Sequence, residues 1–238
     1  MSDYKGYLAY YRSTLSTHKP RLIGGFFRSL LDAKAQKMGQ SSRHALFLDR
    51  VLSLCSKGNS GDITVLEVGP GDGWALSLHR SGLRRIGIDQ GDDFACTLKE
   101  KGIEFYRVNI ETESLPLEDK TVDVIMMNHV IEHLADPLLF LKEAKRTLRP
   151  GGCLYVRTPN IRRVGTAFWE DYTHVRPYTP ASLRAMAEAH GLTHMFTFAS
   201  DHGRINLDIL TEGRLRTFLL APWARGAEIE ACFRLGSP

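Results

Sequence analysis

The sequence predicts an α/β fold with a mostly parallel, doubly wound sheet and helices on both faces. Short apolar runs alternate with amphipathic runs from residue 63 onward, and brief turns separate them. This alternation is typical of strand–helix–strand units, whose strands run parallel. A glycine-rich turn, VLEVGPGDGW at 65–74, follows the first of these strands. Folds of this class bind ligands at the carboxyl ends of their strands, so the turn marks the expected site.

Ahead of the sheet, residues 1–56 are expected to form a helical segment, and residues 57–238 the main domain. Leu48, Val51 and Leu52 recur at helical spacing behind a candidate N-cap at Ser42. The linker KGNSGD follows this segment and precedes the first strand.

The elements of the main domain follow from apolar patterning and from the turn residues between runs. A strong helix is expected where Asp136 can act as N-cap and Pro137 takes the first helical position. The sequence RPGG at 149–152 should end it. Strands are expected at 63–68, 84–89, 103–110, 122–128, 153–160, 194–200 and 227–235, and helices at 75–82, 96–102, 137–148 and 179–192.

Composition narrows the classes of function. A net charge of +4 over 238 residues is too small for a dedicated nucleic-acid binder, so we expect no DNA partner, although an anionic substrate is compatible. No segment has the length and apolarity to span a bilayer, and the N-terminus lacks a signal-peptide core, which favours a cytoplasmic protein. The four cysteines form no CxxC pair, so buried free thiols such as Cys55 and Cys153 are expected rather than a disulfide framework.

The glycine-rich turn fits one cofactor better than another. A dinucleotide fingerprint needs a third glycine where Trp74 stands, and an indole would obstruct the pyrophosphate. The carboxylate of Glu67 would also repel a pyrophosphate but suits a cationic ligand. S-adenosylmethionine (SAM) carries a sulfonium and an ammonium group and no phosphate. Asp89, which ends the second strand, would hold ribose hydroxyls in either case, so the turn and Glu67 favour SAM.

These residues together resemble the class I SAM-dependent methyltransferases. The resemblance rests on ExGxGxG after the first strand, on Asp89, and on LPLEDKTVDVIMMNHVIEHLADPLLFLKEAKRTLRPGG. It covers residues 62–160 closely and implies a Rossmann-like, seven-stranded sheet with a reversed last strand and an N-terminal lid. It also implies that SAM contacts residues at the strand ends. By position these are Glu67, Gly69, Pro70, Gly71, Asp89, Gln90, Asn109, Ile110 and Asn128.

Three hypotheses remain for the histidine-rich segment that follows the fourth strand. His129, Glu132 and His133 share one face of a helical turn, and His174 lies in a later loop expected over the same mouth. The Glu-His pair is a structural cap, or one of His129, His133 and His174 is a general base for an oxygen nucleophile. In the third hypothesis the four residues bind a divalent metal, because small-RNA 2′-O-methyltransferases hold a metal with a similar motif.

The acceptor is expected to be a small molecule or glycan, and the residues after the fifth strand indicate an anionic group on it. Arginines gather there, and planar guanidinium groups suit phosphorylated or nucleotide-linked sugars. The segment DYTHVRPYTPASL is also similar to bacterial sugar-tailoring methyltransferases, which act in polysaccharide biosynthesis. The candidate substrate-binding residues are Arg157, Arg163, Arg176 and Tyr178.

The sequence therefore favours O-methylation of a sugar, glycan or related hydroxyl, by in-line transfer from SAM with a histidine base. An RNA 2′-O- or quinone-type methyltransferase is the alternative, although an RNA enzyme would usually show a stronger basic face. Outside this class, an NAD-dependent oxidoreductase and a catalytically idle SAM-binding protein remain open. The sequence does not indicate an oligomeric state.

Overall fold

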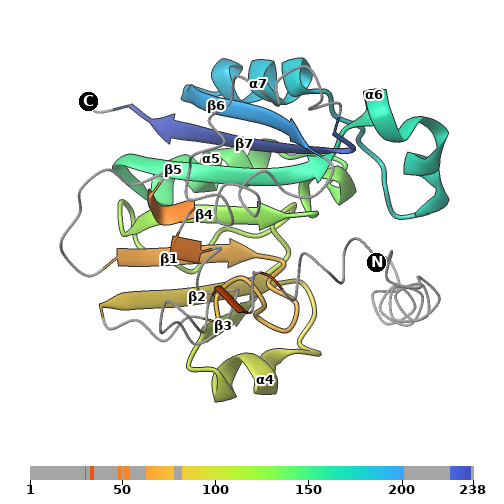
Figure 1. Ribbon diagram of the computed structural model, residues 1–238. Helices are drawn as coiled ribbons and strands as arrows, with labels where there is room; N and C mark the ends of the chain where they lie inside the picture. Colours follow the sequence, from red (N-terminus) through yellow and green to blue (C-terminus); the bar gives the residue numbers. More distant parts are fainter. Residues whose placement is uncertain are drawn as a thin grey trace.

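The computed structural model describes residues 63–77, 82–200 and 226–236, together with isolated helical positions between 30 and 53. Within this part of the chain, seven strands form one sheet in the order β3-β2-β1-β4-β5-β7-β6 (Figure 1). This arrangement confirms the predicted α/β class. The strands are β1 (Ile63–Val68), β2 (Leu83–Asp89), β3 (Glu104–Arg107), β4 (Val122–Asn128), β5 (Leu148–Pro159), β6 (Leu192–Ser200) and β7 (Glu228–Leu235).

The direction of the strands decides which ends meet. The strands from β3 to β5 pair in parallel, whereas β7 pairs antiparallel with both β5 and β6. The expected reversed strand at 227–235 is therefore present, and it lies between β5 and β6. Because β7 is reversed, its first residues lie beside the carboxyl end of β5, where Pro159 pairs with Glu228.

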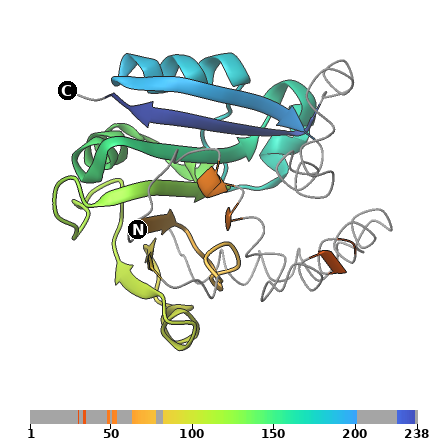
Figure 2. The same ribbon diagram turned by 60° about the vertical axis from the view of Figure 1, so that its left-hand side comes forward.

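Helices and turns connect the strands on the two faces of the sheet (Figures 1 and 2). The helix α5 begins one residue later than expected, with Pro137 rather than Asp136 as its N-cap, although Asp136 Oδ1 accepts a hydrogen bond from Leu138 N at 2.9 Å. Thr179 is the N-cap of α7 and forms a complete capping box with Ser182. The helices are α4 (Ala95–Glu100), α5 (Leu138–Thr147), α6 (Ile161–Val164) and α7 (Pro180–Ala189), with 3-10 helices η1 (Ile131–His133) and η2 (Gly165–Glu170).

Alternation along the strands builds an apolar core on each face. In β1, Leu66 and Val68 belong to a cluster that also includes residues of α5 and α7. Ile63 and Val65 belong to a second cluster, which includes Leu98 of α4. The helical positions Leu48, Val51 and Leu52 are buried in this second cluster. The rest of the expected segment 1–56 lies almost wholly outside the described residues, and Cys55 and residues 201–225 lie outside them as well.

Three predicted details differ in the structure. Residues 75 and 76 form turn rather than the start of a helix, while 78–81 lie outside the described residues. The strand expected over 103–110 is shorter, because β3 ends at Arg107. Finally, β5 begins at Leu148 and includes the residues RPGG. Val122 of β4 pairs with Leu148 and Val124 pairs with Cys153, so the register between the two strands shifts at this point. A glycine-rich turn signal is thus absorbed here as a β-bulge.

The expectations about the cysteines and about membrane-spanning segments can be compared with the described residues. Cys153 and Cys232 are buried free thiols, whereas Cys96 is free but exposed. None of the helices described here combines the length and apolarity needed to cross a membrane.

Candidate active site

The turn after β1 is held in a conformation that needs glycine. Gly69 and Gly71 have φ angles of +67° and +53°, in the left-handed region that side chains disfavour. A Cβ atom on Gly69 would lie 2.5 Å from Cγ2 of Val130, whereas a Cβ atom on Gly71 would meet no described residue within 4 Å. The chain therefore packs tightly at Gly69 and leaves open space beside Gly71, where a ligand can approach the backbone.

Glu67, just ahead of this turn, is a buried acid with unused binding capacity. Its exposed fraction is 3%, and its Oε1 accepts a hydrogen bond from Nδ2 of Asn128 at 2.6 Å. Its Oε2 has no hydrogen-bond partner among the described residues. Burial raises the pKa of Glu67 to about 8 despite the opposing hydrogen bond from Asn128. An ammonium group would satisfy this carboxyl, so the residue fits the cationic amino-acid end of SAM.

The other predicted cofactor residues lie along the same edge of the sheet. Asp89 ends β2 beside the glycine turn, and its Oδ1 accepts a hydrogen bond from Gly91 N at 3.1 Å. Gln90 follows it and is exposed. Asn109 lies just beyond β3, and its Oδ1 accepts from Glu111 N at 3.0 Å. Carboxylate and amide oxygens thus mark the ends of successive strands, as a nucleoside site in this fold requires. Pro70 and Ile110 are both buried.

His129 links the end of β4 to two acids. It is a non-glycine residue with a φ of +54°, and its Nδ1 and Nε2 lie 3.3 Å from Glu132 Oε1 and 3.4 Å from Glu228 Oε1. Desolvation would lower the pKa of His129, but the two acids outweigh it and raise this pKa to about 9. His129 is therefore an imidazolium at neutral pH, which makes it a poor general base and a good fixed cation.

Glu132 is the buried centre of the site. Its side chain is fully buried, its Oε2 accepts a hydrogen bond from Thr158 Oγ1 at 2.9 Å, and its Oε1 has no hydrogen bond among the described residues. Burial would raise the pKa of Glu132, but the neighbouring His129 lowers it overall, so the carboxyl is ionised. Its backbone oxygen accepts from the amides of Val175 and Arg176, both at 3.0 Å. These bonds hold the loop that carries His174 against η1.

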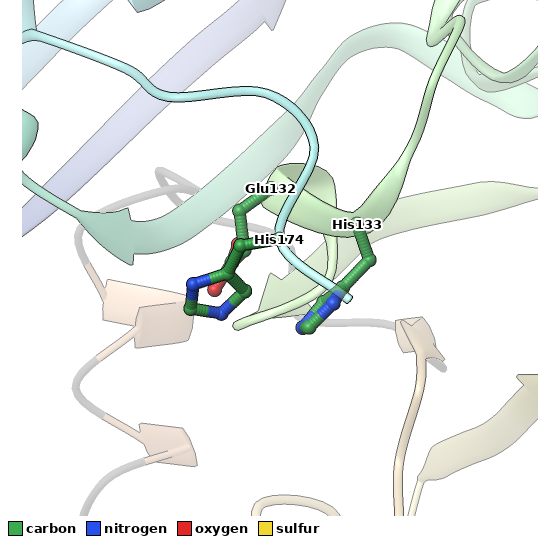
Figure 3. Close-up of side chains that lie close together, drawn as sticks. All are labelled: Glu132, His133 and His174. Atoms are coloured by element: carbon green, nitrogen blue, oxygen red, sulfur yellow. The ribbon is translucent and has the colours of Figure 1, made fainter. Parts of the chain in front are cut away.

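His133 and His174 come together beside Glu132 (Figure 3). Their ring centroids are 4.8 Å apart. Nδ1 of His174 lies 2.7 Å from the carbonyl oxygen of Phe168, which can only accept, so in a neutral ring this nitrogen carries the proton and Nε2, which lies 3.9 Å from Asp171 Oδ2, carries the lone pair. Nδ1 of His133 lies 2.9 Å from Thr173 Oγ1, whose own hydrogen is directed to Asp171 at 2.6 Å. Burial lowers the pKa of His133, so this imidazole is neutral at pH 7.

The predicted substrate-binding residues do not form one cluster. Arg157 of β5 is mostly buried and forms an ion pair with Glu228. The guanidinium of Arg176 donates to the backbone oxygens of Leu134 and Ala135. Tyr178 belongs to the apolar core, where its hydroxyl contacts Met186 Sδ, and burial raises its pKa.

Among the four candidates for substrate binding, Arg163 of α6 has an exposed side chain. We therefore retain it, and not Tyr178, as a candidate contact for an acceptor.

The sequence interpretation missed three contributors. Glu228 pairs with both His129 and Arg157, and although burial opposes the change, these cations lower its pKa to about 2. Thr158 and Thr173 orient Glu132 and His133. A sequence signal exists for the threonines, since each falls in a segment that resembles the family. The sequence around Glu228 does not indicate that this residue lies near the ends of β4 and β5.

Comparison with known proteins identifies this architecture. A family model described as "Methyltransferase domain" matches residues 40–195, which is more than half of the chain. The chain belongs to this methyltransferase family. Its seven-stranded sheet agrees with that of a SAM-dependent methyltransferase from Aquifex aeolicus, with a TM-score of 0.54 at 21% identity over 86% of this chain and 98% of that one.

Similar sequences carry related names. A Mycolicibacterium smegmatis protein named "Probable S-adenosylmethionine-dependent methyltransferase" is 33% identical over 68% of this chain and 62% of its own length. The ubiquinone biosynthesis O-methyltransferase of Parvibaculum lavamentivorans is 33% identical over 45% of this chain and 44% of its own. The chain thus spans less than two thirds of either relative. These relatives support SAM as the cofactor, in agreement with the orphaned carboxyl of Glu67 and the open space at Gly71.

Proposed function

We propose that this methyltransferase transfers a methyl group from SAM to a hydroxyl oxygen of a sugar, glycan or related small molecule. The observation that carries the proposal is the orientation of His174. Its Nδ1 hydrogen bond to Phe168 leaves the Nε2 lone pair for a proton, next to the neutral imidazole of His133. An alcohol is a weak nucleophile until it loses its proton, so a fixed, neutral imidazole suits an oxygen acceptor.

A continuous series of polar contacts supports the connection between this imidazole pair and the cofactor turn. Glu67 binds Asn128, whose neighbour His129 pairs with Glu132, and Glu132 is adjacent to His133. SAM, when bound, supplies an electrophilic methyl group to the nucleophile. The protein's part is then to hold the cofactor's ammonium at Glu67 and its ribose at Asp89, and to align the acceptor oxygen. His129 acts as a positioning residue in this arrangement, because it is already protonated.

Charge and the names of the relatives support two candidate classes of acceptor. Arg163 and Arg162 are exposed on α6, which extends from the carboxyl end of β5, and they favour an anionic group on the acceptor, such as the phosphate of a nucleotide-linked sugar. A quinone-type phenol is the second candidate, since one relative is named as a ubiquinone biosynthesis O-methyltransferase. A phenol ionises more easily than a sugar hydroxyl and depends less on a base.

The test combines cofactor binding with transfer. We expect S-adenosylhomocysteine to bind in calorimetric titration, and NAD not to bind. A panel of nucleotide-linked sugars, free sugars and catechols is then assayed by mass spectrometry for a gain of one methyl group. We expect His174→Ala to retain cofactor affinity but to reduce transfer by about a hundredfold, in the range usual for loss of a general base.

His190→Ala supplies the matched control. His190 also places Nδ1 near a backbone oxygen, that of Met186 at 2.8 Å, but it lies at the end of α7 away from the imidazole pair. This variant should transfer methyl groups at the wild-type rate. Full activity in His174→Ala would remove His174 from the mechanism. Binding of S-adenosylhomocysteine without transfer to any acceptor class would favour an idle SAM-binding protein, and NAD binding in its place would favour an oxidoreductase.

A further inference from the structure

One group of side chains has the composition and spacing of a metal site. Glu132, His133 and His174 each offer one ligand atom, and these three atoms lie within 4.8 Å of one another. Figure 3 shows that two of the side chains come from η1 and that the third comes from the loop after η2. Two imidazoles and one carboxylate form a ligand set that also occurs at catalytic zinc sites with an open fourth position.

The hydrogen bonds around the group orient the rings of both histidines through Nδ1. Nδ1 of His174 is directed to a carbonyl oxygen, and Nδ1 of His133 to the threonine Oγ1 that itself binds Asp171. Metal-bound histidines almost always donate the hydrogen of their other ring nitrogen to such an acceptor, which fixes the tautomer and the ring orientation. Both histidines have this arrangement, which in the neutral rings puts the lone pair on Nε2.

Glu132 provides an independent indication. It is fully buried, and one of its carboxylate oxygens has no hydrogen bond among the described residues, while Thr158 binds the other. A buried ionised carboxylate with an unused oxygen is costly unless it binds a cation or a further donor. The imidazolium of His129 lies 3.3 Å from that oxygen and compensates part of its charge. One ligand atom of His133 and one of His174 lie within 4.8 Å of an oxygen of this carboxylate, so an ion between the three side chains would add a second cation.

We propose that Glu132, His133 and His174 bind one divalent first-row transition-metal ion. Tetrahedral ligands at about 2.1 Å from zinc lie roughly 3.4 Å apart, so the three side chains must draw together by about 1 Å to close on the ion. The mixed nitrogen and oxygen ligands select zinc, manganese or iron over magnesium. His129 is outside the set, because both of its ring nitrogens face carboxylates.

The ion has a use in the reaction proposed above, and this step rests on that proposed function. An ion held by these three side chains would leave a coordination position for the acceptor oxygen and would lower the pKa of its hydroxyl, whose proton would leave to water. With the ion bound, the lone pair of His174 would be a ligand, so the ion would replace this imidazole as the group that activates the hydroxyl. Metal binding itself requires neither SAM nor an acceptor, so it can be measured separately.

The experiment measures binding of Zn²⁺ and Co²⁺ to untagged, chelator-treated protein. We expect about one equivalent of metal per chain by calorimetry and elemental analysis, and a Co²⁺ absorption spectrum typical of four- or five-coordinate nitrogen and oxygen ligands. His133→Ala and His174→Ala should each weaken metal binding by at least a hundredfold. Thr173→Val removes a partner of His133 Nδ1 and should weaken it by about tenfold.

His190→Ala, which leaves the group intact, should bind metal as the wild type does. Circular dichroism of each variant distinguishes the loss of a metal ligand from the loss of the fold. Glu132→Gln removes the carboxylate charge but keeps the volume of the side chain, so it tests the third ligand without a cavity. The inference is overturned if the wild type binds no stoichiometric metal, or if His174→Ala binds it equally well. Titration of the same samples with S-adenosylhomocysteine distinguishes a failure of the metal-binding proposal from a failure of the proposed methyltransferase function. Normal cofactor binding without metal binding would overturn this inference and leave the proposed function standing.

Discussion

At the scale of single residues, the site depends on acids that are buried before any ligand arrives. Glu67 is held by Asn128 on one oxygen and has no hydrogen bond on the other among the described residues. Burial raises its pKa to about 8, so most molecules carry a proton on Glu67 at pH 7. A cationic ligand reverses that preference, because an adjacent positive charge favours the ionised carboxylate.

Binding of S-adenosylhomocysteine should therefore release a proton from Glu67. The free carboxyl is roughly nine tenths protonated one pH unit below its pKa, so close to one proton should leave per ligand at pH 7. The release should diminish as the pH rises through 8, and affinity should increase over the same range. Calorimetry in two buffers with different ionisation enthalpies measures it. Glu67→Gln should bind more weakly and release no proton, and equal heats in both buffers for the wild type would refute the assignment.

Gly69 and Gly71 share a positive φ angle but should respond differently to a side chain. A methyl group costs about 1–2 kcal/mol at either position for the left-handed backbone. Gly69→Ala adds a clash with Val130, so it should lose about 2–4 kcal/mol of unfolding free energy in urea. Gly71→Ala meets open space in the protein and should instead weaken S-adenosylhomocysteine binding by at least about tenfold, since the methyl group enters the space assigned to the ligand.

Val130→Ala provides the comparison. Combined with Gly69→Ala, it removes the clashing methyl group and should recover part of the lost stability. It should bring no recovery to Gly71→Ala, whose proposed defect is in binding. If Gly71→Ala instead lost stability and bound S-adenosylhomocysteine with normal affinity, the ligand would have to lie elsewhere along the turn.

At the scale of elements, one side chain fixes the loop that follows the third strand. Arg146 of α5 donates to the backbone oxygens of Leu115 and Leu117 and to the carboxylates of Asp119 and Glu143. That loop begins next to Asn109, an expected SAM contact. The helix therefore positions part of the proposed cofactor site through one guanidinium group, whose planar set of donors lysine cannot reproduce.

Arg146→Lys should accordingly destabilise the protein while it keeps the charge. Loss of several well-placed donors should reduce the unfolding free energy by about 2–3 kcal/mol, because carbonyl oxygens inside the loop lose their partners. Urea unfolding measures this change. Arg184→Lys is the control, since Arg184 makes an exposed pair with Glu188 on α7 and should change stability by less than about 0.5 kcal/mol. Similar losses in both variants would show that the planar set of donors is unimportant.

The elements also show how far the sequence alone can predict this molecule. Short, continuous apolar runs made β1 and β4 recognisable, and these strands are buried along almost their whole length. Parallel pairing brought Glu67, Asp89 and Asn128 to one edge as expected. Boundaries were less predictable, because pairing with Val122 outweighs the turn preference of RPGG and extends β5.

The partners of the histidines were also beyond local prediction. His133 meets Thr173, forty residues away, and His129 meets Glu228 from the reversed strand. Only the packing of the sheet determines such contacts, whereas the residues at the ends of parallel strands follow from the strand pattern itself.

At the scale of the whole molecule, the last strand joins the sheet to the site. β7 inserts between β5 and β6, and its inward side chains Ile229, Ala231 and Phe233 complete one of the two cores. The same strand begins with Glu228, which pairs with Arg157 of β5 and with His129 after β4. The same strand therefore completes the sheet and carries the acid that pairs with two cations of the site.

A double-mutant cycle on Glu228 and Arg157 should measure that coupling. Both side chains are mostly buried, at 21% and 17% exposed, so removal of either partner leaves a poorly hydrated charge. Glu228→Gln and Arg157→Met should each lower the unfolding free energy by about 2–4 kcal/mol, and the double variant should lose clearly less than the sum. Urea unfolding at constant pH gives the three values. Additive losses would mean that the pair contributes no specific stability, and the strand would then be held by its apolar face alone.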